Sequence, residues 1–165
     1  GGANSEFLTA NQWSAVKVEE YYDDEIYIRE IGMDEVYSYQ EWILCGDTGY
    51  NEVEVNEIHR TNYVYLSVEK NGNLSIESQF YEKYLDWYNS NCTALYVEET
   101  TNNSIAAKWS YDDATRTLIL IYNDEYEDEV ETIVEQYEAN LVNGNLILTY
   151  SYSTSDYVKI AFEPK

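Results

Sequence analysis

The chain has 165 residues, of which 44% are hydrophobic, and this is enough to build one domain with a buried core. It carries 32 acidic and 9 basic residues, for a formal net charge of −23. A surface of this charge repels the phosphates of nucleic acids and of anionic membranes, so neither is expected as a partner. No apolar run approaches the roughly 18 residues of a transmembrane helix, and no such helix is predicted.

The chain begins with Gly-Gly-Ala-Asn-Ser-Glu rather than with Met, which is typical of a processed or engineered terminus. We expect residues 1–7 to be a flexible lead and residues 8–165 to form a single domain. Trp13 lies at the start of the first predicted strand. A closed barrel needs a plug where the chain enters it, and a large flat side chain suits this role. Trp13 is therefore predicted to be structural.

Two stretches are predicted to form short helices. In residues 33–44, apolar and aromatic side chains fall at helical spacing, and Cys45-Gly46 could end the helix. In residues 82–88, Tyr84, Leu85 and Tyr88 also fit a short helix. The rest of the acidic stretch over residues 20–60 shows no pattern that assigns it to a strand or a helix.

From residue 62 onward, apolar and polar residues alternate, as in strands that are buried on one face. The strands at 62–69 and 74–80 flank Asn71-Gly72, a strong hairpin signal because both residue types tolerate positive φ. Further hairpins are predicted over residues 105–122, 132–152 and 145–162. Successive hairpins of this kind favour an all-β fold, either an up-and-down barrel or a sandwich.

The two cysteines, Cys45 and Cys92, form no Cys-x-x-Cys motif and have no histidine pair beside them, so zinc is not suggested. In an exported protein they could form one disulfide that closes a long loop. The alternative is two buried free thiols, and the sequence leaves both possibilities open.

Several segments together resemble a known family. Leu8-Thr-Ala-Asn-Gln-Trp13 resembles the start of the first strand in lipocalin-like domains, where a tryptophan follows a short polar lead. Residues 108–113 and 117–120 resemble the tryptophan-containing hairpin in the middle of that family, and residues 137–148 resemble its late hairpin. These segments cover most of residues 8–162, and the likeness is greatest to the lipocalin-like, calycin-like domains of exported Bacteroides-type lipoproteins.

The resemblance implies an eight-stranded antiparallel up-and-down barrel in an exported protein. Such a protein would lie in the periplasm or at the cell surface. It also implies an N-terminal lipid on a cysteine just before residue 1 of the native precursor. We expect a monomer.

Catalytic and metal chemistry find little support in the sequence. His59 is the single histidine, and no nucleophile motif such as Gly-x-Ser-x-Gly accompanies it. Residues 123–131 are rich in carboxylates but lack the spacing and the glycine of an EF-hand loop, so a solvated acidic turn is favoured. We expect a protein that is not an enzyme and that needs no cofactor or metal.

Aromatic residues give the positive hint about function. Six side chains on the predicted inner faces could line a pocket for a small apolar or amphipathic molecule, although simple filling of the core is the favoured interpretation: Phe80, Trp109, Tyr111, Tyr122, Tyr150 and Tyr152. Four more could form a surface platform for a glycan or a protein: Tyr81, Tyr84, Trp87 and Tyr88. The sequence thus predicts a barrel that binds a small molecule inside, with a surface-binding module as the alternative.

Overall fold

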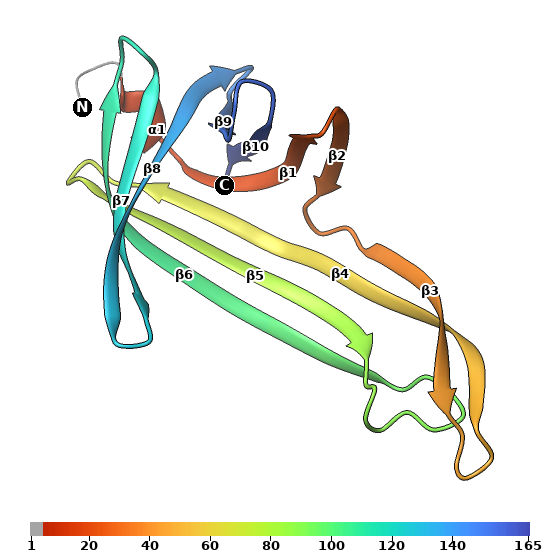
Figure 1. The fold of residues 1–165 in the computed structure, drawn as a ribbon. Coiled ribbons are helices and arrows are strands. Elements are labelled where there is room, and N and C mark those ends of the chain that lie inside the picture. The colour runs from red at the N-terminus through yellow and green to blue at the C-terminus, as the bar shows by residue number, and fades with distance from the viewer. Residues whose placement is uncertain (1–4) are drawn as a thin grey trace. The chain divides into compact units, whose positions relative to one another are not determined.

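The protein is described by a computed structural model that covers residues 5–165. One helix, α1 (Glu6–Thr9), precedes a succession of strands. Its first two residues, Glu6 and Phe7, lie within the predicted flexible lead, and residues 1–4 of that lead fall outside the described part of the chain. The strands are β1 (Gln12–Tyr22), β2 (Glu25–Glu30), β3 (Glu35–Leu44), β4 (Tyr50–Val68), β5 (Asn73–Leu85), β6 (Tyr96–Asp112), β7 (Thr117–Tyr126), β8 (Glu129–Val142), β9 (Asn145–Ser151) and β10 (Tyr157–Pro164) (Figure 1).

Eight of the strands close into an antiparallel barrel. They follow the order β1-β10-β9-β8-β7-β6-β5-β4, and β1 then pairs with β4 to complete the ring. The closing contact is short, with Gln12, Trp13 and Ser14 opposite Ser67, Leu66 and Tyr65. The other two strands lie outside the ring, β2 beside β1 and β3 beside β4. The predicted eight-stranded up-and-down barrel is therefore confirmed, and the sandwich alternative is wrong.

The chain divides into two compact units. The first comprises the residues up to 31 together with 63–78 and 103–165, and we call it the barrel unit because the strand pairs that close the ring lie in it. The second comprises residues 32–62 and 79–102, and we call it the sheet unit. It contains β3 and the adjoining parts of β4, β5 and β6. Within residues 5–165, no helix has the length and apolar character to span a membrane.

The core of the barrel unit is built from inward-facing aliphatic side chains around one tryptophan. Trp13 is 1% exposed, and its indole Nε1 donates a hydrogen bond of 3.0 Å to the carbonyl oxygen of Leu8. Leu8 belongs to α1 and is fully buried, so the helix packs against the core. Trp13 is thus a structural residue, as predicted. The core also contains Ala15, Leu66, Val68, Leu74, Ala107, Leu118, Leu120, Ala139, Leu146, Leu148 and Phe162.

Both predicted helices were wrong. Residues 35–44 form β3, whose side chains are mostly exposed, so the apolar spacing that suggested a helix reflects no buried face. In the second stretch, β5 continues to Leu85. A single turn follows, in which the N–H of Ser90 donates to the carbonyl oxygen of Asp86 over 3.0 Å.

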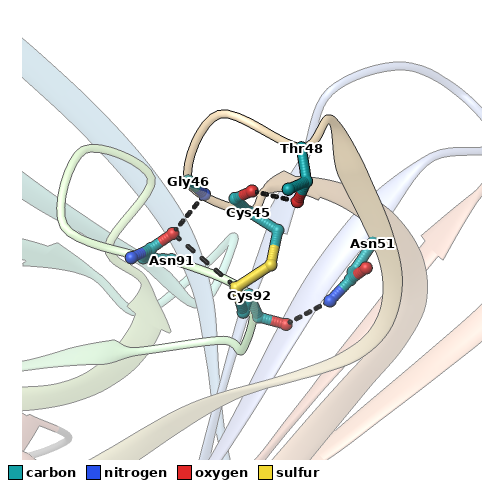
Figure 2. The surroundings of a disulfide bond; sticks show 6 residues. All are labelled: Cys45, Gly46, Thr48, Asn51, Asn91 and Cys92. Atoms are coloured by element: carbon teal, nitrogen blue, oxygen red, sulfur yellow. Dashed lines mark hydrogen bonds between the residues drawn. A yellow bond between two sulfur atoms is a disulfide. The ribbon is translucent and has the colours of Figure 1, made fainter.

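A disulfide between Cys45 and Cys92 joins two loops of the sheet unit (Figure 2). Cys45 directly follows β3, and Cys92 lies in the loop between β5 and β6. The Asn91 side chain accepts a hydrogen bond of 2.9 Å from the N–H of Gly46, and Asn51 donates one of 3.3 Å to the carbonyl oxygen of Cys92. Of the two possibilities left open by the sequence, the structure therefore has the disulfide.

Two tight hairpins of the barrel unit have the same geometry but different residues. Asn143-Gly144 connects β8 and β9 with φ of 51° and 83°, whereas Glu127-Asp128 connects β7 and β8 with φ of 46° and 68°. Asparagine and glycine adopt positive φ readily, but glutamate does so at a cost. The β7–β8 turn is therefore held in place by its strands.

Exchange of Glu127-Asp128 for Asn-Gly should raise the free energy of unfolding by about 1 kcal/mol, because it removes this backbone cost. Urea unfolding would measure the change. The reverse exchange at Asn143-Gly144, to Glu-Asp, should lower stability by a similar amount. Equal stability of the wild type and both variants would contradict the interpretation.

Candidate functional site

Strand register divides the side chains of β7, β8 and β9 between two faces. Leu118 and Leu120, which are buried, lie opposite Tyr137 and Glu135 of β8. Residues opposite one another on antiparallel strands point to the same face. Glu135 and Tyr137 therefore point to the inner side of the barrel unit.

Glu135 is an inward-facing carboxylate held by two tyrosines. The hydroxyl of Tyr122 donates a hydrogen bond of 2.6 Å to Oε1, and the hydroxyl of Tyr137 donates one of 2.6 Å to Oε2. Glu135, Tyr122 and Tyr137 are all half-buried. A partly buried carboxylate needs such donors, because its charge would otherwise lose hydration without compensation.

The two hydroxyls remain protonated over a wide pH range. The hydrogen bond to Glu135, then burial and the charge of Glu135, raise the pKa of Tyr122 to about 12. Burial, followed by the hydrogen bond to Glu135, raises the pKa of Tyr137 well above its usual value. Both tyrosines therefore act as donors at neutral pH. Because a carboxylate offers about four acceptor positions, Glu135 can accept further hydrogen bonds.

A row of tyrosine rings runs from this carboxylate along β9. Tyr137 lies 5.6 Å from Tyr150 between ring centroids, and Tyr150 lies 4.8 Å from Tyr152 in an edge-to-face arrangement. Tyr152 directly follows β9, and its ring contact with Tyr150 extends the row beyond the end of the strand. We call Tyr137, Tyr150 and Tyr152 the tyrosine row.

The row ends at a pocket of about 330 Å³. This pocket lies where β1 and β10 pair near the turns that follow β1 and precede β10. Tyr152 is 69% exposed at its mouth. The pocket is lined by Glu20, Tyr21, Tyr22, Tyr152, Tyr157 and Val158. Such a lining offers aromatic faces and one carboxylate, and its volume is at the lower end of the range for small-molecule sites.

The predicted inner residues separate into three places. Tyr122, Tyr150 and Tyr152 lie in or beside the tyrosine row. Trp109 and Tyr111 lie outside the row and, like Tyr122, pack against the core. The indole of Trp109 donates to the carbonyl oxygen of Glu69 over 2.7 Å, and Tyr111 meets Phe7 edge to face. Phe80 is half-buried and belongs to the sheet unit.

The four residues of the predicted surface platform do not share one face. Tyr81 and Tyr84 lie three residues apart on β5, and their hydroxyls donate to adjacent residues of β6, Glu98 and Glu99. Because successive strand residues point to opposite faces, these two tyrosines face opposite sides of the sheet. Trp87 and Tyr88 follow in the loop and are 53% and 95% exposed.

Glu135 was not identified from the sequence, although a signal was present. Ile133, Tyr137, Ala139 and Leu141 alternate along one phase of β8, and Glu135 occupies the same phase. A carboxylate at an apolar phase of a strand indicates an inward-facing charge that needs partners.

Among the described residues, no three or more His, Cys, Asp or Glu side chains are grouped so that they could hold a metal ion. His59 is exposed on β4, with its ring 5.0 Å from that of Tyr37. Comparison of the chain with protein-family models, with curated proteins and with solved structures found no match.

Proposed function

We propose that the protein is a non-enzymatic, lipocalin-like barrel that binds a small amphipathic molecule in the pocket at the end of the tyrosine row. The observation that carries this proposal is the continuous path of aromatic faces from Glu135 through Tyr150 to Tyr152 and the pocket. Rigid aromatic side chains provide a large contact area for an apolar body.

The polar group of the ligand follows from the charges at this site. Glu20 lines the pocket, with one of its carboxylate oxygens paired to Arg29 over 3.1 Å, and Glu135 lies at the other end of the row. The pocket lining itself contains no Lys or Arg. A ligand with an amine, an ammonium or hydroxyl groups would meet acceptors and ring faces, to which cations are attracted. An anionic ligand would meet the carboxylate of Glu20 and no cation among the lining residues. We therefore expect a neutral or cationic amphiphile.

We further propose that the protein acts outside the cytoplasm, with the lipid anchor that the family resemblance implies. The Cys45–Cys92 disulfide supports this location, because disulfides persist in oxidising compartments and are rare in the cytosol.

Fluorescence titration with N-phenyl-1-naphthylamine, a neutral amphipathic probe, tests the binding site. We expect saturable binding to one site, and we expect Tyr152→Ser to weaken it about tenfold through loss of an aromatic contact. Tyr126→Ser is the matched control, because Tyr126 is 71% exposed in the same unit but lies outside the pocket lining. Absence of saturable binding, or equal effects of the two variants, would contradict the proposal.

The second candidate is a surface module that uses Trp87 and Tyr88, which are both exposed in one loop. Its distinguishing result is loss of probe binding in the variant Trp87→Ala/Tyr88→Ala with binding retained in Tyr152→Ser. The pocket at the end of the tyrosine row predicts the opposite pattern.

A further inference from the structure

A second hollow lies on the outer face of the barrel unit, across β1, β10, β9 and β8. Register places Lys17 opposite Ala161 and Glu19 opposite Lys159, and Ala161 in turn opposite Ile147 of β9. These residues alternate with the inward-facing Phe162 and Leu146, so they belong to the outer face. Ala161 is nevertheless only 7% exposed, and it lines a groove of about 810 Å³.

Three of the nine basic residues of the chain line this groove: Lys17, Arg116 and Lys159. This is unexpected for a protein with 32 acidic residues, in which cations have many carboxylates to pair with. The ion pairs found among the described residues are Arg29–Glu20 and Arg60–Asp34, and neither includes a cation of the groove. None of the three cations of the groove therefore forms an ion pair with a carboxylate of the described residues.

The contacts of these cations orient them without occupying all their donors. Arg116 donates one hydrogen bond of 3.0 Å to the side-chain oxygen of Asn140, and its own carbonyl oxygen accepts the N–H of Ala139 over 2.8 Å, which fixes the turn beside β8. The ammonium of Lys159 lies 5.2 Å from the ring centroid of Tyr157. A guanidinium has five N–H donors and an ammonium three, so most remain for a ligand.

The other side chains of the groove narrow the class of ligand. Glu19 and Glu138 lie among the cations, and Thr149 and Ser151 add hydroxyl groups. Carboxylates repel a bare polyanion but accept hydrogen bonds from hydroxyl groups. The groove thus has cations for an oxyanion and acceptors for hydroxyls.

We propose that this outer groove is a second binding site, which takes a small hydroxylated organic anion of the sugar-acid type. Lys17 and Lys159, which lie on the paired strands β1 and β10, bind its carboxylate, and Glu19 and Glu138 accept hydrogen bonds from its hydroxyl groups. Arg116 lines the groove at β8, where it can donate to an oxygen at the other end of the ligand. This site is opposite in charge preference to the tyrosine-lined pocket, although Tyr157 lines both.

Amide NMR titration of the full chain with D-glucuronate tests the proposal, with D-glucose and inorganic phosphate as comparison probes at constant ionic strength. We expect saturable shifts of the amides of Lys17, Ile147, Thr149 and Lys159 with glucuronate. Glucose, which lacks the carboxylate, and phosphate, which lacks the hydroxylated body, should each bind at least about tenfold more weakly.

The variant Lys17→Gln/Lys159→Gln should weaken glucuronate binding at least about tenfold. The matched control is Lys70→Gln/Lys83→Gln, which also removes two positive charges but from residues outside the groove. This control should bind glucuronate as the wild type does. Equal loss in both variants, equal binding of glucose, or no saturable shift with glucuronate would overturn the proposal. Retained binding of N-phenyl-1-naphthylamine in Lys17→Gln/Lys159→Gln would show that the barrel remains folded, and it separates this site from the pocket.

Discussion

Replacement of Trp13 with alanine should lower the free energy of unfolding of the barrel unit by about 3–5 kcal/mol. Its side chain is 1% exposed and lies within the core cluster. Truncation therefore leaves a large cavity among core residues that come from the other strands of the barrel unit. The substitution also removes the donor for the Leu8 carbonyl oxygen, which ties α1 to the core. Loss of Trp13 should therefore release α1 as well as weaken the ring.

Urea unfolding, followed by circular dichroism and by hydrogen exchange of barrel amides, measures this effect. Trp13→Phe should lower stability less than Trp13→Ala does, because it keeps an aromatic ring in the core. It still removes the indole hydrogen bond, and a buried polar group left without its partner costs about 1–2 kcal/mol. Trp42→Ala is the control for an exposed tryptophan, since Trp42 is 56% exposed. A loss for Trp13→Ala no larger than that for Trp42→Ala would show that Trp13 does not organise the core.

The second large effect is expected from removal of the disulfide. The two cysteines are 47 residues apart, and a cross-link over a loop of this length contributes about 4 kcal/mol in the chain-entropy description. The stability of the sheet unit depends strongly on this disulfide. Its fully buried apolar side chains, among the described residues, are Ile43 and Val55, and so small a core supplies little stabilisation.

The expected result for Cys45→Ser/Cys92→Ser is thus selective loss of structure in the sheet unit. Hydrogen exchange read by mass spectrometry should show lost protection in β3 and in the β5–β6 loop, with protection retained in β7 to β10. A reducing agent should reproduce this pattern in the wild type and should add nothing in the double variant. Uniform loss across both units, or no loss, would contradict this account.

The sequence predicted the barrel hairpins because two local signals agreed there. Alternating apolar residues mark the strands from residue 62 onward, and turn residues such as Asn143-Gly144 mark their ends. In β3 the first signal is absent. Val36, Tyr37 and Trp42 are all exposed although they occupy both phases of the strand, so no buried face gave the sequence a period of two. Its β-branched and aromatic composition was the better guide, since such residues favour strands.

The candidate site could be predicted only in part. Tyr122 and Tyr150 were named as candidates because aromatic residues on the inward phase of a strand stand out in an alternating pattern. Tyr152 was named with them but follows β9 and is 69% exposed. The separation of Trp109 and Tyr111 from them depends on where along the barrel each side chain lies, which is set by the register between strands rather than by any single strand. The outer groove depends on register in the same way, because Lys17 and Lys159 are far apart in sequence and lie close only through the pairing of β1 with β10.

The strand pairs that make up the barrel differ in length. β7 and β8 are paired over ten positions and β1 and β10 over eight, whereas β1 and β4 share three. Beyond Ser14 the free edge of β1 turns to β2 instead, after a bulge between Ala15 and Lys17. A force or a thermal fluctuation that opens the barrel would meet little resistance at the short pairing of β1 with β4. We therefore expect the barrel to open there into a continuous sheet. Trp13 and Leu66, which form one of those three pairs, are both buried in the core.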